Sequence, residues 1–332
     1  MSRSILLGHC FGRSFGRAGA LAATVVLLGS SSGFAHTIVG NRVFPATLTI
    51  DDPGVNDELA LPAFAYMPGG INPDGSLAPD NYNIGWEYAK TITSDLGFSI
   101  GSNGYTWQRN PSGSGWANIE TQMKYVFYQN PEHEFIVAGA TNISWANTGS
   151  SSAAAIPSNP YTVVTPKAYI GKGFGDLQTE WVRPIAVTGE VDYSLPTSPV
   201  NSITMNQNPT VLTYGATLQY SLLYTNSYVH QLPEFVNRLI PSFEAYFSSP
   251  ISNTGPSIPG QWVHETTGVV GPSIYYIGQY YEIGVMAQIP VNEASGRHVG
   301  ALAVLDFFLD DIFPNSIGKP LFGAPPSRGN VY

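Results

Sequence analysis

Four acidic residues lie within positions 51–58, and their spacing makes them the first candidates for chemistry. Asp51, Asp52, Asp57 and Glu58 lie in the segment "TIDDPGVNDELAL". Carboxylates in a loop can bind a cation such as Ca²⁺, but the calcium loop needs oxygen ligands at alternate positions, which this spacing lacks. We therefore expect a solvated acidic loop, whose role the sequence does not define.

Histidines supply the other candidates. A copper site at His36 would use the terminal amine of a processed chain, but no second histidine is suitably spaced. His298, Asp306 and Asp310 share one parity of a strand, as a general base and its carboxylate could. However, the eight positions from 298 to 306, at ~3.3 Å each, place His298 and Asp306 too far apart for a hydrogen bond.

The "GKGFG" at 171–175 lacks the setting of a phosphate loop, and G-x-S-x-G is absent. We expect no catalytic residues, no metal and no cofactor.

The elements that must position these side chains alternate polar and apolar residues. In "NIETQMKYVFYQNPEHEFIVAGATNISW" at 118–145, Ile119, Met123 and Tyr125 lie on one face, and Glu120 and Lys124 lie on the other. Side chains of a strand alternate between its two faces, so this segment predicts a β-hairpin. The same alternation recurs at 81–93, 96–109, 181–195, 210–222, 239–249, 279–290 and 298–309.

The lengths of these runs favour a membrane barrel over a soluble sheet. Many runs reach ten residues, whereas soluble strands average roughly five or six and tilted membrane strands need roughly nine to eleven. Short connections ("SD", "NPEH", "VNEASGR") alternate with longer loops at 110–116, 147–178 and 249–273. The stretch 147–178 is expected to be mostly loop, with room for a short strand near 161–169. We predict an all-β fold, an antiparallel transmembrane β-barrel of about ten strands (eight to twelve). Aromatic residues near the strand ends would form interfacial girdles: Trp145, Tyr193, Tyr281 and Phe127.

The polar faces of these strands would line a wet lumen, because a dry core could not accept so many acids. The predicted lumen-lining residues are Glu120, Lys124, Glu190, Asp192, Gln219 and Glu282. The alternative is a secreted soluble β-sandwich with shorter strands, whose polar faces meet solvent.

An export signal precedes the strands. Three arginines come before an apolar run at 18–28, and Gly33 and Ala35 occupy the small positions before a cleavage site after Ala35. An uncleaved anchor is the alternative. Cleavage removes Cys10, the one cysteine, and leaves 14 − 3 = 11 basic against 23 acidic residues, a net charge of −12. This charge excludes nucleic acid as a partner.

The chain therefore divides into four predicted parts. Residues 1–35 form the signal peptide, and 36–80 an N-terminal extension that is loosely ordered or folded against the rest. Residues 81–309 form the barrel, and 310–332 form a tail rich in proline and glycine.

Three segments carry a resemblance to a known family. The acidic pair Asp51 and Asp52, the strand "NIETQMKYVF" and the segment "GKGFGDL" at 171–177 resemble the outer-membrane barrels named for the MetA pathway of phenol degradation, often described as transporter-like. The resemblance implies an outer-membrane location, passage of small and often hydrophobic compounds, and no agreed catalytic residues. The chain departs from many such barrels because its last strand stops near Leu309, well before Tyr332.

The expected function is passive passage or binding of small hydrophobic or cationic solutes in the bacterial outer membrane, with lipid and solute as partners. Three alternatives stay open: an outer-membrane hydrolase, a barrel too narrow to conduct, and the secreted sandwich. The sequence does not define the solute, the oligomeric state or whether the lumen is plugged.

Overall fold

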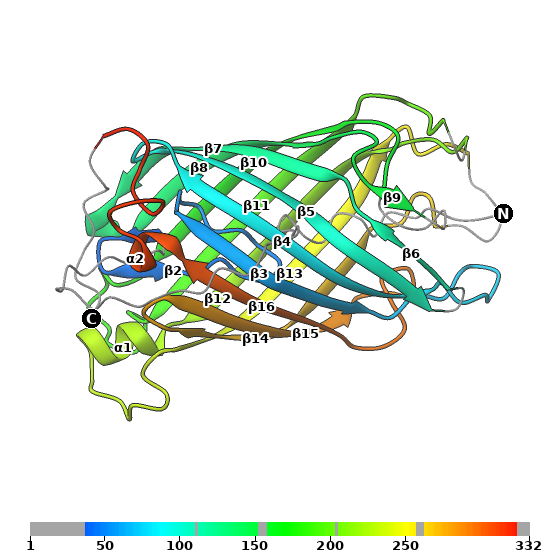
Figure 1. Cartoon of the computed structure of the whole chain (residues 1–332). Coiled ribbons are helices and arrows are strands. Elements are labelled where there is room, and N and C mark those ends of the chain that lie inside the picture. Colours follow the sequence, from blue (N-terminus) through cyan, green and yellow to red (C-terminus); the bar gives the residue numbers. More distant parts are fainter. Residues whose placement is uncertain (1–36, 110–111, 152–157, 203–204, 257–261, 324–332) are drawn as a thin grey trace.

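The computed structural model describes residues 37–109, 112–151, 158–202, 205–256 and 262–323, and its main feature is a closed ring of twelve antiparallel strands (Figure 1). The predicted signal peptide, with Cys10, and His36 lie outside these residues. The ring consists of β3 (Glu58–Met67), β4 (Asp80–Thr91), β5 (Leu96–Arg109), β7 (Ile119–Asn130), β8 (Phe135–Ser144), β10 (Val163–Gly173), β11 (Ile185–Pro196), β12 (Thr210–Tyr220), β13 (Leu239–Ser252), β14 (Thr267–Ile277), β15 (Tyr281–Pro290) and β16 (Gly300–Phe308).

Each strand of the ring pairs with its neighbours along the chain, and the first strand closes on the last. β3 pairs with β16 in the register Ala301↔Tyr66 to Phe308↔Glu58. Closure leaves no exposed edge in the ring that could recruit another chain. Two short strands, β6 (Gly113–Trp116) and β9 (Ser150–Ser151), extend the sheet beside β5. The predicted barrel is confirmed, with twelve strands at the upper limit of the expected range, and the sandwich alternative is wrong.

Two strands of the ring correct the expected boundaries. The barrel begins at Glu58 rather than at Asn81, because β3 belongs to it. β3 contains Pro62, and its register with both neighbours shifts near Ala60, so its side chains do not alternate regularly. β10 lies within 147–178, a stretch that was expected to be mostly loop.

The two ends of the barrel differ in their connections. At the turn end lie 92–95, 131–134 with the 3₁₀ turn η1 (Pro131–His133), 174–184, 221–238 with α1 (Leu222–Tyr228), and 278–280. At the loop end lie 68–79, 110–118, 145–162, 197–209, 253–266 and 291–299. The short segment "VNEASGR" therefore lies opposite "SD" and "NPEH", and the turn end carries one long connection, the one that contains α1.

The polarity of the barrel wall is inverted relative to a soluble protein. On β12, Thr217 is 0% exposed and the next residue, Leu218, is 54% exposed. On β13, Phe243 is 50% exposed and Glu244 is 0% exposed. Polar side chains thus point into the ring and apolar side chains point outward, as in barrels that face lipid.

Aromatic side chains gather on the outside near both ends. At the loop end, Tyr66 stacks on Tyr82 at 4.8 Å and Tyr82 on Trp107 at 5.4 Å between ring centroids. At the turn end, Tyr125 contacts Phe127 edge-on at 5.3 Å. Of the predicted girdle residues, Trp145, Tyr193 and Phe127 are exposed and Tyr281 is half-buried. Two bands of this kind would place the apolar outer face between the headgroup regions of a bilayer.

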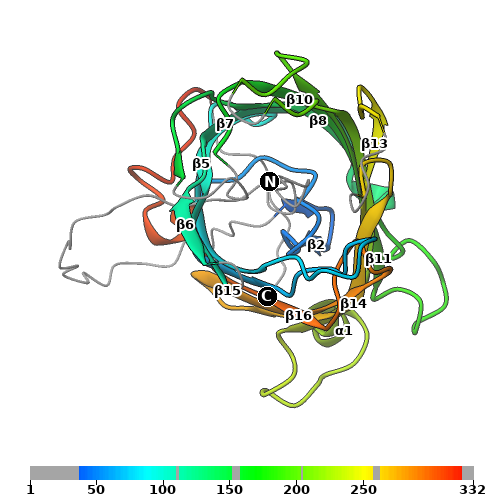
Figure 2. The same ribbon diagram turned by 90° about the vertical axis from the view of Figure 1, so that its right-hand side faces the viewer.

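An additional segment lies inside the ring. β1 (Thr37–Val39) and β2 (Arg42–Phe44) form a small hairpin, and residues 45–57 continue from it to the start of β3. Figure 2, which looks along the barrel axis, shows β2 and the following blue segment enclosed by the strands. We call residues 37–57 the plug segment.

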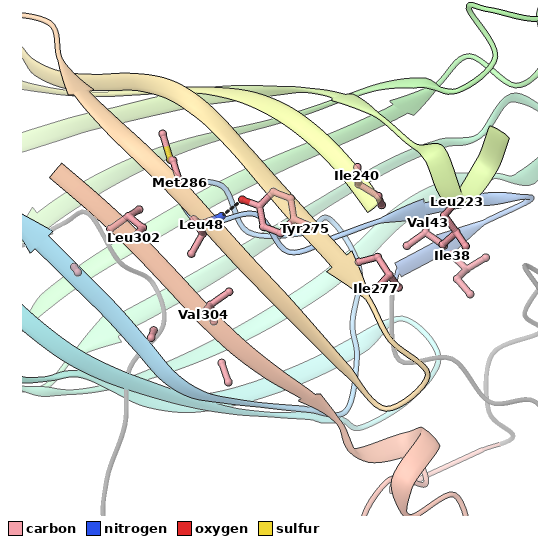
Figure 3. Close-up of a cluster of buried hydrophobic side chains, with 13 residues drawn as sticks. Ile38, Val43, Leu48, Leu223, Ile240, Tyr275, Ile277, Met286, Leu302 and Val304 are labelled. Atoms are coloured by element: carbon pink, nitrogen blue, oxygen red, sulfur yellow. Dashed lines mark hydrogen bonds between the residues drawn. The ribbon is translucent and has the colours of Figure 1, made fainter. Parts of the chain in front are cut away.

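The apolar core of the protein is the contact between the plug segment and the wall (Figure 3). Ile38, Val43 and Leu48 of the plug segment pack against wall residues such as Ile240 and Ile277. These wall residues are exceptions to the pattern of polar side chains on the inner face, because they face the hairpin rather than water. Burial of these side chains stabilises the plugged state.

The C-terminal tail folds back over the turn end. α2 (Leu309–Ile312) follows β16, and the backbone N–H groups of Leu321 and Phe322 donate to the carbonyls of Thr91 and Ile92. No helix within the described ranges is long and apolar enough to cross a membrane.

Lys90 ties the plug segment, a wall strand and the tail together. Its Nζ donates to Asp57 and to the carbonyls of Ile317 (2.9 Å) and Lys319 (2.8 Å), which uses all three of its N–H donors. The Asp57 side chain is only 1% exposed. Asp57 also accepts from the Thr91 N–H at 3.1 Å, and its carbonyl accepts from the Leu309 N–H at 2.8 Å.

The variant Lys90→Met is expected to lose stability. It leaves the buried Asp57 carboxylate without its cation, and breaking one side of a buried ion pair costs about 3–5 kcal/mol. The measurement is the temperature at which the folded form disappears on SDS gels after stepwise heating. Lys319→Met, at an exposed position, is the matched control, and equal melting of both variants would contradict the role of Lys90.

Candidate functional site

The lumen is the candidate site, and the plug segment forms part of its lining. Residues 46–50 are buried without lying in a strand, so their backbone N–H groups need other partners. Wall side chains supply them. The Leu48 N–H donates to Tyr275 Oη (2.7 Å), and the Thr49 N–H donates to Glu244 Oε2 (3.0 Å).

Glu244 is the central acceptor for the plug segment. Its Oε2 also accepts from Thr49 Oγ1 at 2.6 Å, and its Oε1 accepts from Tyr275 Oη. Two further contacts continue along the segment: Thr47 Oγ1 lies 3.1 Å from Thr217 Oγ1, and the Asp51 N–H donates to Glu190 Oε2 at 2.9 Å. Buried polar groups on β11, β12, β13 and β14 therefore hold the plug segment by hydrogen bonds as well as by packing.

Arg42 closes the turn end of the lumen. Its Nε donates to Glu134 Oε2 at 3.1 Å, its Nη1 donates to the Pro184 carbonyl at 2.9 Å, and its Nη2 donates to the Arg183 carbonyl. The guanidinium also lies 4.1 Å from the ring centroid of Tyr224 on α1. Burial lowers the pKa of Arg42, and the Glu134 carboxylate raises it in part.

Glu134 is positioned by the turn that carries it. It ends η1 in the left-handed region, at φ 45° and ψ 46°, which turns its side chain toward Arg42. The Gly175 N–H donates to its Oε2 at 3.0 Å, so the carboxylate joins two turns and the plug segment. The surrounding contacts must hold this conformation, because a residue with a Cβ rarely adopts it.

The acidic segment is buried, which corrects the expected solvated loop. Lys124 on β7 reaches inward, and its Nζ lies 2.8 Å from Asp51 and 3.6 Å from Asp52. Asp52 accepts from the Gly54 N–H (2.8 Å) and from Asn56 Nδ2 (2.7 Å), which fixes the local turn. A lysine from the wall therefore supplies the positive charge for Asp51 and Asp52.

A cavity remains between the plug segment and the wall strands on one side of the lumen. Its volume is about 70 Å³, enough for roughly five waters. Glu190 and Asp192 on β11 both bind Lys167 on β10, with Nζ–O distances of 2.7 and 2.9 Å. The residues that line the cavity include Leu48, Thr49, Asp51, Asn103, Glu120, Asn142, Lys167, Glu190, Asp192, Thr213 and Tyr246.

The six predicted lumen residues fall into three places. Glu120, Glu190 and Asp192 line the cavity. Lys124 binds the plug segment. Gln219 and Glu282 are each 1% exposed; Gln219 donates to Thr188 Oγ1 at 3.4 Å, and Glu282 pairs in register with Asp306.

Several residues of the site were not anticipated. Lys167 was missed because its strand lay in a stretch that was expected to be mostly loop. The alternation of Thr165, Lys167 and Tyr169 against Pro166 and Ala168 was the available signal. The plug residues Thr47 to Asp51 carry no such signal, since their role depends on the wall around them.

The histidine–carboxylate pair considered above does not form. His298 is exposed at the loop end, whereas Asp306 is buried near the turn end. Within the described ranges, no three His, Cys, Asp or Glu side chains gather as metal ligands would.

Comparisons with known proteins give no family for this chain. No protein-family model matches it, and no curated protein matches it. The expected kinship with the phenol-degradation family is therefore not shown.

Among solved structures, the chain is similar to outer-membrane barrels. These include the KdgM porin in complex with disordered oligogalacturonate, with TM-score 0.39 and 10% identity over 74% of this chain and 98% of that one. OprD from Pseudomonas aeruginosa has TM-score 0.33 and 13% identity over 85% and 73%. LpxR from Salmonella typhimurium has TM-score 0.37 and 11% identity over 76% and 99%. Similarities this low carry no argument about the lumen.

Proposed function

We propose that the protein is an outer-membrane β-barrel that takes small neutral or cationic solutes into a lumen whose turn end is closed by the plug segment. The observation that carries this proposal is the inverted polarity of the wall, with Glu244 and Thr217 inside and Phe243 and Leu218 outside. In water this arrangement would expose apolar surface all around the ring, whereas in a bilayer it removes that surface from water.

The orientation follows from the two ends. Both the first and the last strand of the ring reach the turn end, and outer-membrane barrels place their short turns in the periplasm. We assign the turn end to the periplasm and the loop end to the exterior. A solute would then enter from the loop end and reach the cavity, which lies between the plug segment and the wall.

The electrostatics of the cavity support a preference for cations. Its charged lining consists of Asp51, Glu120, Glu190 and Asp192 against Lys167. A ring of acids in a lumen favours cations over anions. The pair of His298 and Asp306 does not support hydrolysis, because the two residues lie near opposite ends of the barrel. The kinship with the phenol-degradation family stays a prediction.

The mobility of the protein on SDS gels tests the membrane barrel. Closed barrels resist SDS until they are heated, because every backbone hydrogen bond of the ring must break together. We expect the detergent-extracted protein to migrate differently before and after boiling, and to fractionate with outer membranes. A soluble periplasmic protein without a mobility shift would overturn the proposal.

The variant Glu190→Gln tests the charge of the lumen. In a protein that lacks residues 37–56, we expect the cation-to-anion permeability ratio to fall roughly twofold, because one acid of the passage is lost. The measurement is the reversal potential across a planar bilayer with a salt gradient. Glu180→Gln, an exposed position in the connection before β11, is the control and should leave the ratio unchanged.

A further inference from the structure

Two polar atoms of the described residues face the cavity without a hydrogen-bond partner. Among the described residues, Asp192 Oδ1 and Thr213 Oγ1 are buried and have no hydrogen-bond partner. Thr213 is 1% exposed and Asp192 is 6% exposed. Both line the cavity. Leaving such groups unpaired is costly, so their presence together points to a ligand.

These two atoms come from directly opposed residues on adjacent strands. Asp192 on β11 is the register partner of Thr213 on β12, and both side chains point into the ring. The carboxylate oxygen can only accept a hydrogen bond, and the hydroxyl oxygen can also accept one. The pair therefore forms a place for a group with at least two N–H or O–H donors.

The charge balance of the cavity selects a cation. Four carboxylates, those of Asp51, Glu120, Glu190 and Asp192, meet one ammonium, that of Lys167. Lys124 on β7 neutralises the Asp51 carboxylate, from which its Nζ lies 2.8 Å. Acidic side chains therefore outnumber basic ones in the cavity lining, which favours a cation over an anion.

The donor pattern favours an ammonium over a metal ion. Lys167 Nζ already lies 2.9 Å from the Asp192 carboxylate, which shows that this carboxylate accepts from an ammonium. A bare divalent ion needs six or more oxygen ligands, or a near-ideal octahedron, and its double charge would be repelled by Lys167 twice as strongly as the single charge of an ammonium. A primary ammonium needs only three acceptors and carries a single charge.

We propose that Asp192 and Thr213 bind the ammonium group of a small primary amine, whose apolar part lies against Leu48, Val163 and Val304 of the cavity lining. A volume of about 70 Å³ accommodates a ligand of about five non-hydrogen atoms, the space of roughly five waters. This inference rests on the proposed function, for which it names the solute class.

Calorimetric titration of the full-length mature protein in detergent, with propylammonium chloride as the probe, tests the proposal. We expect saturable binding, with tetramethylammonium binding at least about tenfold more weakly, since it has the same charge and no N–H donor. Thr213→Val keeps the shape and removes the hydroxyl, and it should weaken propylammonium about tenfold. Asp192→Asn should weaken it further. Thr141→Val, on the outer face of β8, is the matched control.

The outcomes separate this inference from the proposed function. Equal binding of the two cations, or no effect of Thr213→Val, would overturn the ammonium site. If the protein shows the SDS mobility shift and still binds no propylammonium, the barrel stands and the inference fails. If the shift is absent, the proposed function fails whatever the titration shows.

Discussion

Deletion of residues 37–56 is expected to open the barrel to ions. The full-length protein should give little conductance in planar bilayers, because the plug segment occupies the ring and Arg42 closes its turn end. The deletion keeps Asp57, the partner of Lys90. A twelve-strand ring is wider than the eight-strand barrels that their own side chains fill, so we expect conductance to rise at least about tenfold.

The deletion should be tolerated by the barrel itself. Lys124, Glu190 and Glu244 lose their contacts with the plug segment, but the emptied lumen admits water to solvate them. The apolar patch around Ile240 and Ile277 becomes wet, which lowers stability without breaking any strand pairing. The SDS mobility shift should therefore remain and serve as the check that the ring has closed.

A disulfide provides the matched control in the full-length chain. Thr47 Oγ1 and Thr217 Oγ1 are 3.1 Å apart, so the double variant Thr47→Cys/Thr217→Cys places two sulfur atoms within bonding reach. The mature chain has no other cysteine after cleavage at the predicted site. The oxidised variant should stay closed. A full-length protein that conducts as well as the deletion variant would show that the plug segment does not block the lumen.

Loss of either Arg42 or Glu134 is expected to release the hairpin from the turn end. Both side chains are almost fully buried, 0% and 4% exposed, and removing one partner leaves the other charge uncompensated. Breaking a buried pair in this way costs about 3–5 kcal/mol. We expect Arg42→Leu and Glu134→Gln to make the hairpin accessible to limited proteolysis and to raise conductance part of the way toward that of the deletion variant.

A double-mutant cycle isolates the pair. If the two residues act through each other, the double variant should be little worse than either single variant, because the second substitution removes the charge that the first left unpaired. Lys172→Met is the control, since its partner Asp176 lies on the same turn end and the group is more exposed. Additive effects of the two substitutions would contradict a direct coupling between Arg42 and Glu134.

The sequence by itself determined the class of fold. Alternation of side chains is a local property with a period of two, so runs such as that of β12 reveal both their strand and their polar face without knowledge of the neighbours. The length of the runs then favoured a membrane barrel. Glu120, Glu190 and Asp192 could be named as lumen residues on this basis, since parity alone puts them inside.

The tertiary structure decided what the lumen contains. Arg42 meets Glu134 across 92 positions of the chain, and Thr49 meets Glu244 across 195. No local pattern encodes such pairs, because they exist only once the ring has closed around the plug segment. For the same reason the sequence predicts a solvated loop for the acids at 51–58, whereas in the closed ring Lys124 binds Asp51 and Lys90 binds Asp57.

Irregular strands are a second case in which a local sequence pattern does not predict which side chains face the lumen. In β3 the shift of register near Ala60 breaks the alternation, and in β7 a shift between Val126 and Tyr128 turns both Phe127 and Tyr128 outward. A bulge changes the parity of everything beyond it. Which residues face the lumen in such strands is therefore determined by pairing with the neighbouring strands, and only the closed barrel specifies that pairing.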